Sequence, residues 1–346
     1  MSILRFFLFI SIVPLFCMRP TLCFASLTPV QYTSFQGKNL TLYAYKGRNI
    51  SLLVDKSTYD ITVLLKLIDK LDLAYDYYHL ITDKYPEIFK VYDGLLSIAV
   101  VDSTCGAGCG YLGWTGVEIQ SSYFEQTYNE IRNNNRYTHL LFYELGRNFW
   151  FYGKQLGDKM DAFVTGFAVA NRYRAMEYAN ALGAPEINKS FEQLKNQIFT
   201  EVPHLYFKND SLSWLNTLAL NVPPENPYGL DCVCLAAGLL NRIWTDFGNS
   251  IYANFYKALY KLPIANTQQE AANNFIQAYQ EATGTTHGCP LLKTNFQVLS
   301  SIFGSTHSIP SGANKGAFYG FGEYANTINS HNENFDRSLT ESPEFH

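Results

Sequence analysis

The sequence has no excess of basic residues. Its 26 Lys and Arg stand against 30 Asp and Glu, which gives a formal net charge of -4 at pH 7. Proteins that bind nucleic acid through its phosphates usually carry a strongly basic surface. After residue 25 there is also no apolar run long enough to cross a bilayer. We therefore expect neither a nucleic-acid partner nor a membrane span.

Several catalytic motifs are missing as well. The chain contains no G-x-S-x-G nucleophile elbow, no P-loop lysine motif and no dinucleotide-binding fingerprint. The glycine-rich stretch CGAGCGYLGWTG at 105–116 lacks both a lysine and the strand-to-helix placement that a phosphate cradle needs. The sequence therefore predicts no cofactor.

The first 25 residues have the pattern of a cleavable signal peptide. Arg5 precedes an apolar stretch from Phe6 to Cys17, and Ala25 fits the position before a cleavage site. The stretch is too short for a membrane span. We expect a secreted or extracellular protein, which would be periplasmic in a bacterium.

The remaining chain is rich in residues that can be buried. Hydrophobic residues make up 47% of the sequence and aromatic residues 16%, enough for a large core in one domain or two packed units. Residues 305–346 turn to Ser, Gly and Asn with few aliphatic side chains, which is typical of a mobile tail.

The cysteines predict one local disulfide. Removal of the leader leaves five of the seven: Cys105, Cys109, Cys232, Cys234 and Cys289. Cys105 and Cys109 lie in CGAGC, whose glycines allow the tight loop that a short bridge requires. The alternative is a four-sulfur metal site that joins this pair to Cys232 and Cys234, although neither spacing is usual for zinc.

Four N-x-S/T sequons begin at Asn39, Asn49, Asn188 and Asn209. In a eukaryotic host they would mark exposed loops of a glycoprotein.

Hydrophobic patterning divides the chain into two halves. The first half alternates strands with helices: strands are expected in 49–55, 94–102 and 110–120, and helices in 61–81 and from residue 122. From Tyr137, apolar side chains recur every four residues through Leu141, Leu145 and Phe149, which predicts a largely buried helix. Helices are expected next in 161–180, 190–199, 211–220, 230–262 and 267–282.

The buried helix contains YELGRNFW, Tyr143 to Trp150. This segment resembles the HELGH-type zinc helix of the gluzincin metallopeptidases, which belong to the zincin fold. In that motif two histidines hold zinc and the glutamate activates the metal-bound water. Here Tyr143 and Arg147 replace the histidines, and Glu144 alone is retained.

A second stretch is similar to the helix that carries the third zinc ligand in gluzincins. In DAFVTGFAVANRY, Thr165 stands where that glutamate would be. The resemblance implies an α+β fold in which a zincin-like α/β unit with a mixed sheet, residues 26–165, precedes a helical unit, residues 166–304. It also implies that 110–120 is the edge strand that binds extended peptide through its main chain.

The replaced ligands favour a pseudo-peptidase. A phenol is a poor zinc ligand while protonated, and a guanidinium places a permanent positive charge beside the metal position. We expect a cleft without metal that binds a peptide, protein or glycan ligand. The candidate binding residues are Tyr143, Glu144, Arg147, Asn148, Thr165 and Trp114.

Three alternatives stay open. The chain would be an active metallopeptidase if His139, Glu144, and Asp158 or Asp161 formed a non-standard metal site, with Glu144 as the catalytic base. It would be a secreted interaction protein if it had no zincin ancestry. Finally, Glu144 and Arg147 would form only a helical ion pair at a spacing of three residues.

Overall fold

The computed structural model describes residues 29–156, 161–186, 188–286 and 289–293. The expected signal peptide and the expected tail lie outside the described residues. Seven strands are found in this part of the chain: β1 (Pro29–Thr33), β2 (Asn39–Lys46), β3 (Ile50–Val54), β4 (Val91–Tyr92), β5 (Leu95–Val101), β6 (Gly108–Gly110) and β7 (Val117–Gln120). The α-helices described are α1 (Ile61–Thr82), α2 (Ser121–Asn134), α3 (Leu140–Arg147), α4 (Gly153–Leu156), α5 (Asp161–Tyr178), α6 (Phe191–Asn196), α7 (Val202–Lys208), α8 (Cys232–Tyr260) and α9 (Gln268–Thr283).

The strands form one mixed sheet in the order β1-β2-β3-β5-β7-β6, with β4 paired to β5. The central strands β3, β5 and β7 are parallel, whereas β1, β2 and β6 run antiparallel to their neighbours. All five residues of β3 are buried, as expected for a central parallel strand covered on both faces. The expected α+β class is confirmed.

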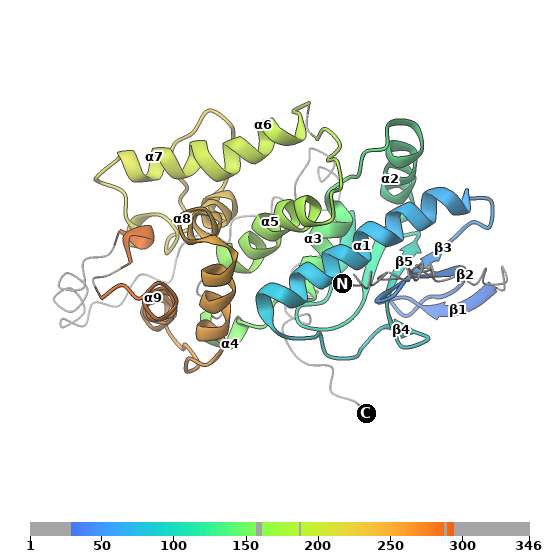
Figure 1. Ribbon diagram of the computed structural model, residues 1–346, viewed down its shortest axis with the longest axis horizontal. Coiled ribbons are helices and arrows are strands. Elements are labelled where there is room, and N and C mark those ends of the chain that lie inside the picture. The colour runs from blue at the N-terminus through green and yellow to red at the C-terminus, as the bar shows by residue number, and fades with distance from the viewer. Residues whose placement is uncertain (1–28, 157–160, 187, 287–288, 294–346) are drawn as a thin grey trace, which may run out of the picture.

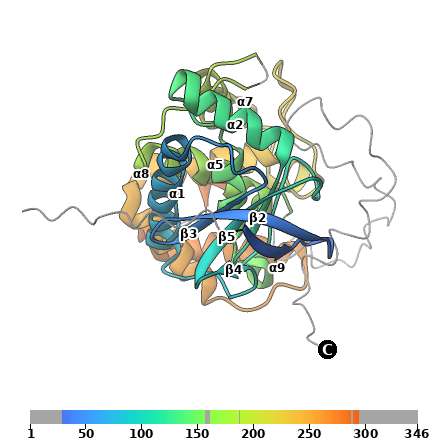
Figure 2. The ribbon, with the colours of Figure 1, turned by 90° about the vertical axis from the view of Figure 1, so that its right-hand side faces the viewer.

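The helices of the second half lie to one side of the sheet along the molecule's long axis. In Figure 1 the strands occupy the right side, and α7, α8 and α9 gather at the left. Figure 2 looks onto the sheet end, where α1 and α2 lie beside the strands. One hydrophobic cluster runs from β3 and α1 through α5 to α9, while a smaller cluster around Leu42 and Ala99 covers part of the sheet. The core is thus shared by both halves, and the expected division at residue 165 falls within α5.

Two expected elements differ from the structure. The segment 110–120 is not one strand, because Gly113 and Gly116 adopt φ angles of 78° and 127° and let the chain reverse between β6 and β7. The expected helix at 211–220 is reduced to one 3₁₀ turn, Trp214–Asn216. The Asn216 side chain accepts the backbone N–H of Ser213 and donates to the backbone carbonyl of Ser211, in competition with helical bonding.

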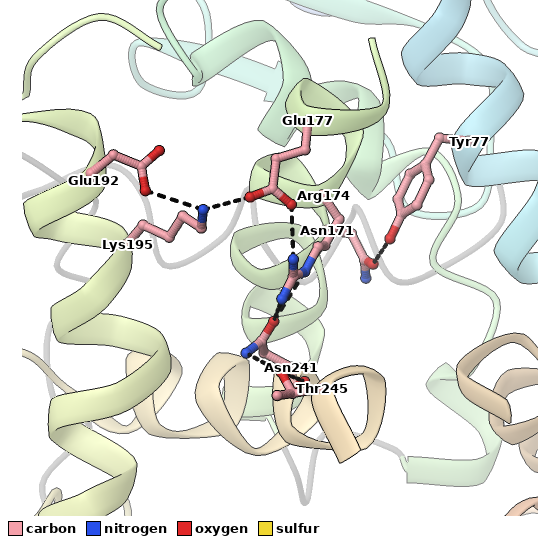
Figure 3. A network of polar contacts seen from close by, with 8 residues as sticks. All are labelled: Tyr77, Asn171, Arg174, Glu177, Glu192, Lys195, Asn241 and Thr245. Carbon is pink, nitrogen blue, oxygen red and sulfur yellow. Dashed lines mark hydrogen bonds and ion pairs between the residues drawn. The ribbon is translucent and has the colours of Figure 1, made fainter. Parts of the chain in front are cut away.

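Helices α5, α6 and α8 are joined by the polar network drawn in Figure 3. Arg174 of α5 donates to Glu177 at 2.8 Å and to the side-chain oxygen of Asn241 on α8 at 3.1 Å. Lys195 of α6 pairs with Glu177, and the Arg174 guanidinium also lies 3.6 Å above the Trp244 ring centre. Because guanidinium groups bind amide or carboxylate oxygens and stack on rings at once, Arg174 fixes α5 to α8, while Lys195 joins α6 to the same network through Glu177.

A buried carboxylate fixes α1 to the turn between β2 and β3. Asp72 accepts hydrogen bonds from the backbone N–H groups of Arg48 at 2.7 Å, Asn49 at 2.8 Å and Ile50 at 3.1 Å. A Cβ atom at Gly47 would lie 2.2 Å from an Asp72 carboxylate oxygen, so the close approach requires glycine. The Asp72 carboxylate therefore supplies the hydrogen-bond acceptors that these backbone N–H groups do not find in the sheet.

Replacing Asp72 with Ala should lower the free energy of unfolding by about 3 kcal/mol, because three backbone donors lose their acceptor in a buried turn. Urea unfolding measures the change. The matched control is Asp69→Ala on the exposed side of the same helix, for which a change below about 0.5 kcal/mol is expected. Equal effects of the two substitutions would contradict this role of Asp72.

Candidate functional site

Helix α3 is the element expected to carry the site, and it is buried as its four-residue repeat predicts. Leu141, Leu145 and Phe149 have no exposed surface, and Tyr137, before the helix, is 3% exposed. The helix packs closely on α1 because Gly146 faces Tyr78, whose hydroxyl donates to the Phe142 carbonyl at 2.7 Å. A Cβ atom at position 146 would lie 2.7 Å from that hydroxyl. The glycine of YELGR is therefore needed for helix packing.

Glu144 points from α3 to the edge strand β6. Its Oε2 accepts the backbone N–H of Gly110 at 2.9 Å, and its side chain is 6% exposed. A Cβ atom on Gly108 would lie 2.8 Å from Glu144 Cγ, and one on Gly110 would lie 2.3 Å from the Glu144 carbonyl oxygen. Only glycines at these alternate positions let the strand lie directly on the helix.

Arg147 binds the carbonyl group of Gly110, the residue whose N–H is bound by Glu144. Its Nε donates to the Gly110 carbonyl at 3.2 Å, and its Nη1 donates to the Tyr143 hydroxyl at 3.3 Å. The Arg147 Nε also lies 3.9 Å from Glu144 Oε2, so the ion pair expected at this spacing is present. Two side chains of α3 thus hold both the N–H and the C=O of Gly110.

Burial changes the acidity of Glu144. The loss of water around the carboxylate raises its pKa to about 7, against the opposing effects of Arg147 and of the Gly110 N–H. Near neutral pH the group therefore exchanges a proton more readily than an ordinary glutamate.

The expected disulfide is found in the structure. Cys105 and Cys109 are bonded, with their Cα atoms 5.6 Å apart, and the second of them lies in β6. Cys232, Cys234 and Cys289 are buried free thiols, and burial raises the pKa of each. Since the bridge uses both sulfurs of the first pair, the four-sulfur alternative is excluded in this structure.

The other expected binding residues are only partly brought together. Asn148 is fully buried, and its amide donates to the carbonyls of Tyr111 at 2.9 Å and Gly116 at 3.0 Å, so it supports the loop between β6 and β7. Trp114 lies half-buried in that loop, where its backbone bridges to Glu87. Thr165 is half-buried on α5, the helix that packs beside α3.

His139 belongs to a different group of polar side chains. It precedes α3 and contacts the carboxylate of Glu186, near the buried Arg172. Burial, and secondarily Arg172, lowers the pKa of His139 well below its ordinary value. Asp158 lies outside the described residues, as does the side chain of Asp161. Among the side chains that are described, no three His, Cys, Asp or Glu are grouped so that they could hold a metal ion.

Sequence reasoning missed the part that Gly108 and Gly110 play. The signal was present in GCG, because glycines at alternate positions of a strand leave one face without side chains. Their partner could not be read from the sequence, since Glu144 follows Gly110 by 34 residues and meets it only in the folded chain.

Comparison with known proteins gives no assignment. No family model matches the chain, and no curated protein matches it significantly. Two crystal structures from Bacillus anthracis str. Ames are similar, one of a functionally unknown conserved protein and one of a functionally unknown conserved protein mutant. Each is 12% identical over 70% of this chain and 46% of the other, with TM-scores of 0.44 and 0.46. This chain spans about half the length of those proteins.

None of the helices in the described ranges is both long and apolar enough to cross a membrane.

The contacts of Glu144 and Arg147 with Gly110 form a clamp on that residue, which can be tested with two substitutions of Glu144. Glu144→Ala removes the acceptor and leaves a cavity, so the free energy of unfolding should fall by about 3 kcal/mol. Glu144→Gln keeps an oxygen for the Gly110 N–H and should cost less than half as much. Amide hydrogen exchange at Gly110 should accelerate in the alanine variant alone; unchanged exchange there would contradict the clamp.

The raised pKa of Glu144 predicts a pH dependence with a definite sign. The folded protein holds this proton more tightly than the unfolded chain, whose Glu pKa is about 4.5. The resulting stability is therefore complete below pH 4.5 and is lost as the pH rises through about 7. The free energy of unfolding of the wild type, measured relative to Glu144→Gln, should fall by about 3 kcal/mol between pH 4.5 and 8. If the free energies of unfolding of the two proteins changed with pH in parallel, the raised pKa of Glu144 would be contradicted.

Proposed function

We propose that the protein is an exported, gluzincin-like binding protein without zinc peptidase activity, in which the former catalytic helix holds its own edge strand. The observation that carries the proposal is the double contact of Glu144 and Arg147 with Gly110. In a zincin, an edge strand offers such main-chain groups to an extended peptide. Here both groups of Gly110 are satisfied within the chain.

The chemistry of α3 agrees with a loss of catalysis. A metallopeptidase glutamate acts on water that a metal has made acidic, but Tyr143 and Arg147 occupy the two positions where that helix would supply ligands. The Arg147 guanidinium is charged at all ordinary pH values and lies 3.9 Å from the Glu144 carboxylate. It replaces part of the positive charge that a metal would provide.

The side chains left for a ligand lie at the rim of α3. Tyr143 and Arg147 are one turn apart and only partly buried, whereas Arg172, 5.8 Å from the Tyr143 ring centre, is itself buried. Thr165 and Trp114 are half-buried on neighbouring segments. We propose that this rim contacts a peptide or glycoconjugate, while Glu144 and Asn148 support it from below.

A second candidate is a protein-binding role without any former cleft. Large apolar side chains are exposed where α1 and α8 end: Tyr85 is 64% exposed and Ile264 is 60% exposed. The two helix ends are in contact there, because Lys84 lies 3.4 Å over the Tyr260 ring. Exposed apolar surface of this kind favours a protein partner.

Peptide and glycan arrays, together with metal analysis, separate these functions. The pure wild-type protein should contain no tightly held zinc, and a ligand found on the arrays should lose at least tenfold in affinity in Tyr143→Ala. Glu144→Gln should bind it as the wild type does, because it keeps the acceptor for Gly110.

An active peptidase would behave in the opposite way. One tightly held zinc per chain, with peptide cleavage that a chelator and Glu144→Gln both abolish, would contradict the proposal. Array binding that resists Tyr143→Ala but is lost in Tyr85→Ser would instead favour the surface at the ends of α1 and α8.

A further inference from the structure

A separate pocket opens between α1, the end of α2 and the segment that follows α5. Its volume is about 330 Å³, and its walls are Lys66, Asp69, Lys70, Asn135, Tyr137, Asn180 and Leu182. Helix α1 packs against both α2 and α5, and both figures show it running beside them (Figures 1 and 2). None of these residues belongs to the rim of α3, so the pocket is independent of the function proposed above.

Backbone hydrogen bonds and caps hold the chain segments that line the pocket. Asn135 and Asn180 both adopt φ angles of 51°, and the first is the C-cap of α2, where asparagine tolerates the left-handed conformation. Between them, the Tyr137 N–H donates to the Leu182 carbonyl at 2.8 Å, and the Ala184 N–H donates to the Tyr137 carbonyl at 2.9 Å. These bonds hold the two helix ends together and place both asparagine side chains at the same opening.

The pocket walls combine positive charge with hydrogen-bonding groups. Lys66 and Lys70 lie one turn apart on α1, and Lys70 pairs at 3.7 Å with Asp69. Within the described ranges Lys66 has no ion-pair partner. Two ammonium groups against one carboxylate leave a net positive charge at the opening.

The remaining wall is amphipathic. Leu182 is 60% exposed, and the ring of Tyr137 is almost fully buried in the wall. Burial, and then the Asp69 charge, raises the pKa of Tyr137, so its hydroxyl remains a proton donor at neutral pH. Sugar rings present both an apolar face and several hydroxyls, which suit such a mixture of aliphatic, aromatic and amide groups.

We propose that this pocket binds a small acidic saccharide, a free uronic acid or the uronic acid end of a glycan. The ammonium groups of Lys66 and Lys70 bind the carboxylate, the amides of Asn135 and Asn180 bind ring hydroxyls, and Leu182 covers the apolar face. The volume is at the lower end of the range for ligand pockets, so it accommodates one sugar ring rather than a long chain.

Titration with D-glucuronate, followed by calorimetry or ligand-observed NMR, tests the site in the full mature chain. Saturable binding is expected, with D-glucose, acetate and phosphate each at least tenfold weaker. In Lys66→Gln/Lys70→Gln the affinity for D-glucuronate should fall at least tenfold. Asp69→Asn should raise it severalfold, because a carboxylate that repels the ligand is removed.

The matched control is Lys208→Gln/Lys261→Gln, which removes the same charge from residues that do not line the pocket. It should bind D-glucuronate as the wild type does. An equal loss in the control would show an unspecific charge effect and overturn the proposal, as would the absence of binding in the wild type. Phosphate binding as tight as D-glucuronate binding would also overturn it, because the sugar-specific contacts would then contribute nothing.

The D-glucuronate test can be distinguished from the test of the residues at the rim of α3. Substitution of Tyr143 should leave D-glucuronate binding unchanged, and the lysine substitutions on α1 should not affect a ligand that contacts the rim.

Discussion

The contact between α3 and β6 fixes the buried helix of the first half against the edge of the sheet. A backbone amide and carbonyl at a sheet edge need partners once they are buried, and Gly110 obtains both from Glu144 and Arg147. The same helix is held from below by Tyr78 of α1, and its own buried face joins the core that continues to α9. Loss of either partner would leave a polar group of β6 without compensation at a buried edge of the sheet.

This contact changes the meaning of a motif that looks catalytic in the sequence. A glutamate in a buried helix, with a pKa near 7, has features of a general base. Its surroundings give a different reason for those features: burial raises the pKa, and the carboxylate is engaged by a backbone N–H. The proposed binding function therefore depends on the rim residues, with Glu144 acting as their support.

The elements that the sequence predicts well are those with strong local patterns. The repeat from Tyr137 to Phe149 predicts the burial of α3, and the glycines of CGAGC predict the short disulfide. The α+β class was expected from the order of predicted strands and helices together with the gluzincin resemblance. Contacts between distant segments were not predictable. The hydrogen bond from Gly110 to Glu144 and the three backbone hydrogen bonds to Asp72 depend on how the packed elements are aligned in the fold. The failed helix at 211–220 shows a further limit, since apolar spacing does not reveal side chains that bond their own backbone.

The glycines of β6 also restrict which substitutions this sequence can accept during evolution. A side chain at position 108 would meet the Glu144 side chain, and one at position 110 would meet the α3 backbone. A larger residue at position 108 is therefore tolerated only together with a shorter one at position 144, whereas position 110 has no such compensating partner. Among descendants of this sequence, positions 108 and 144 should vary as a pair, while position 110 stays glycine for as long as the helix lies against the strand.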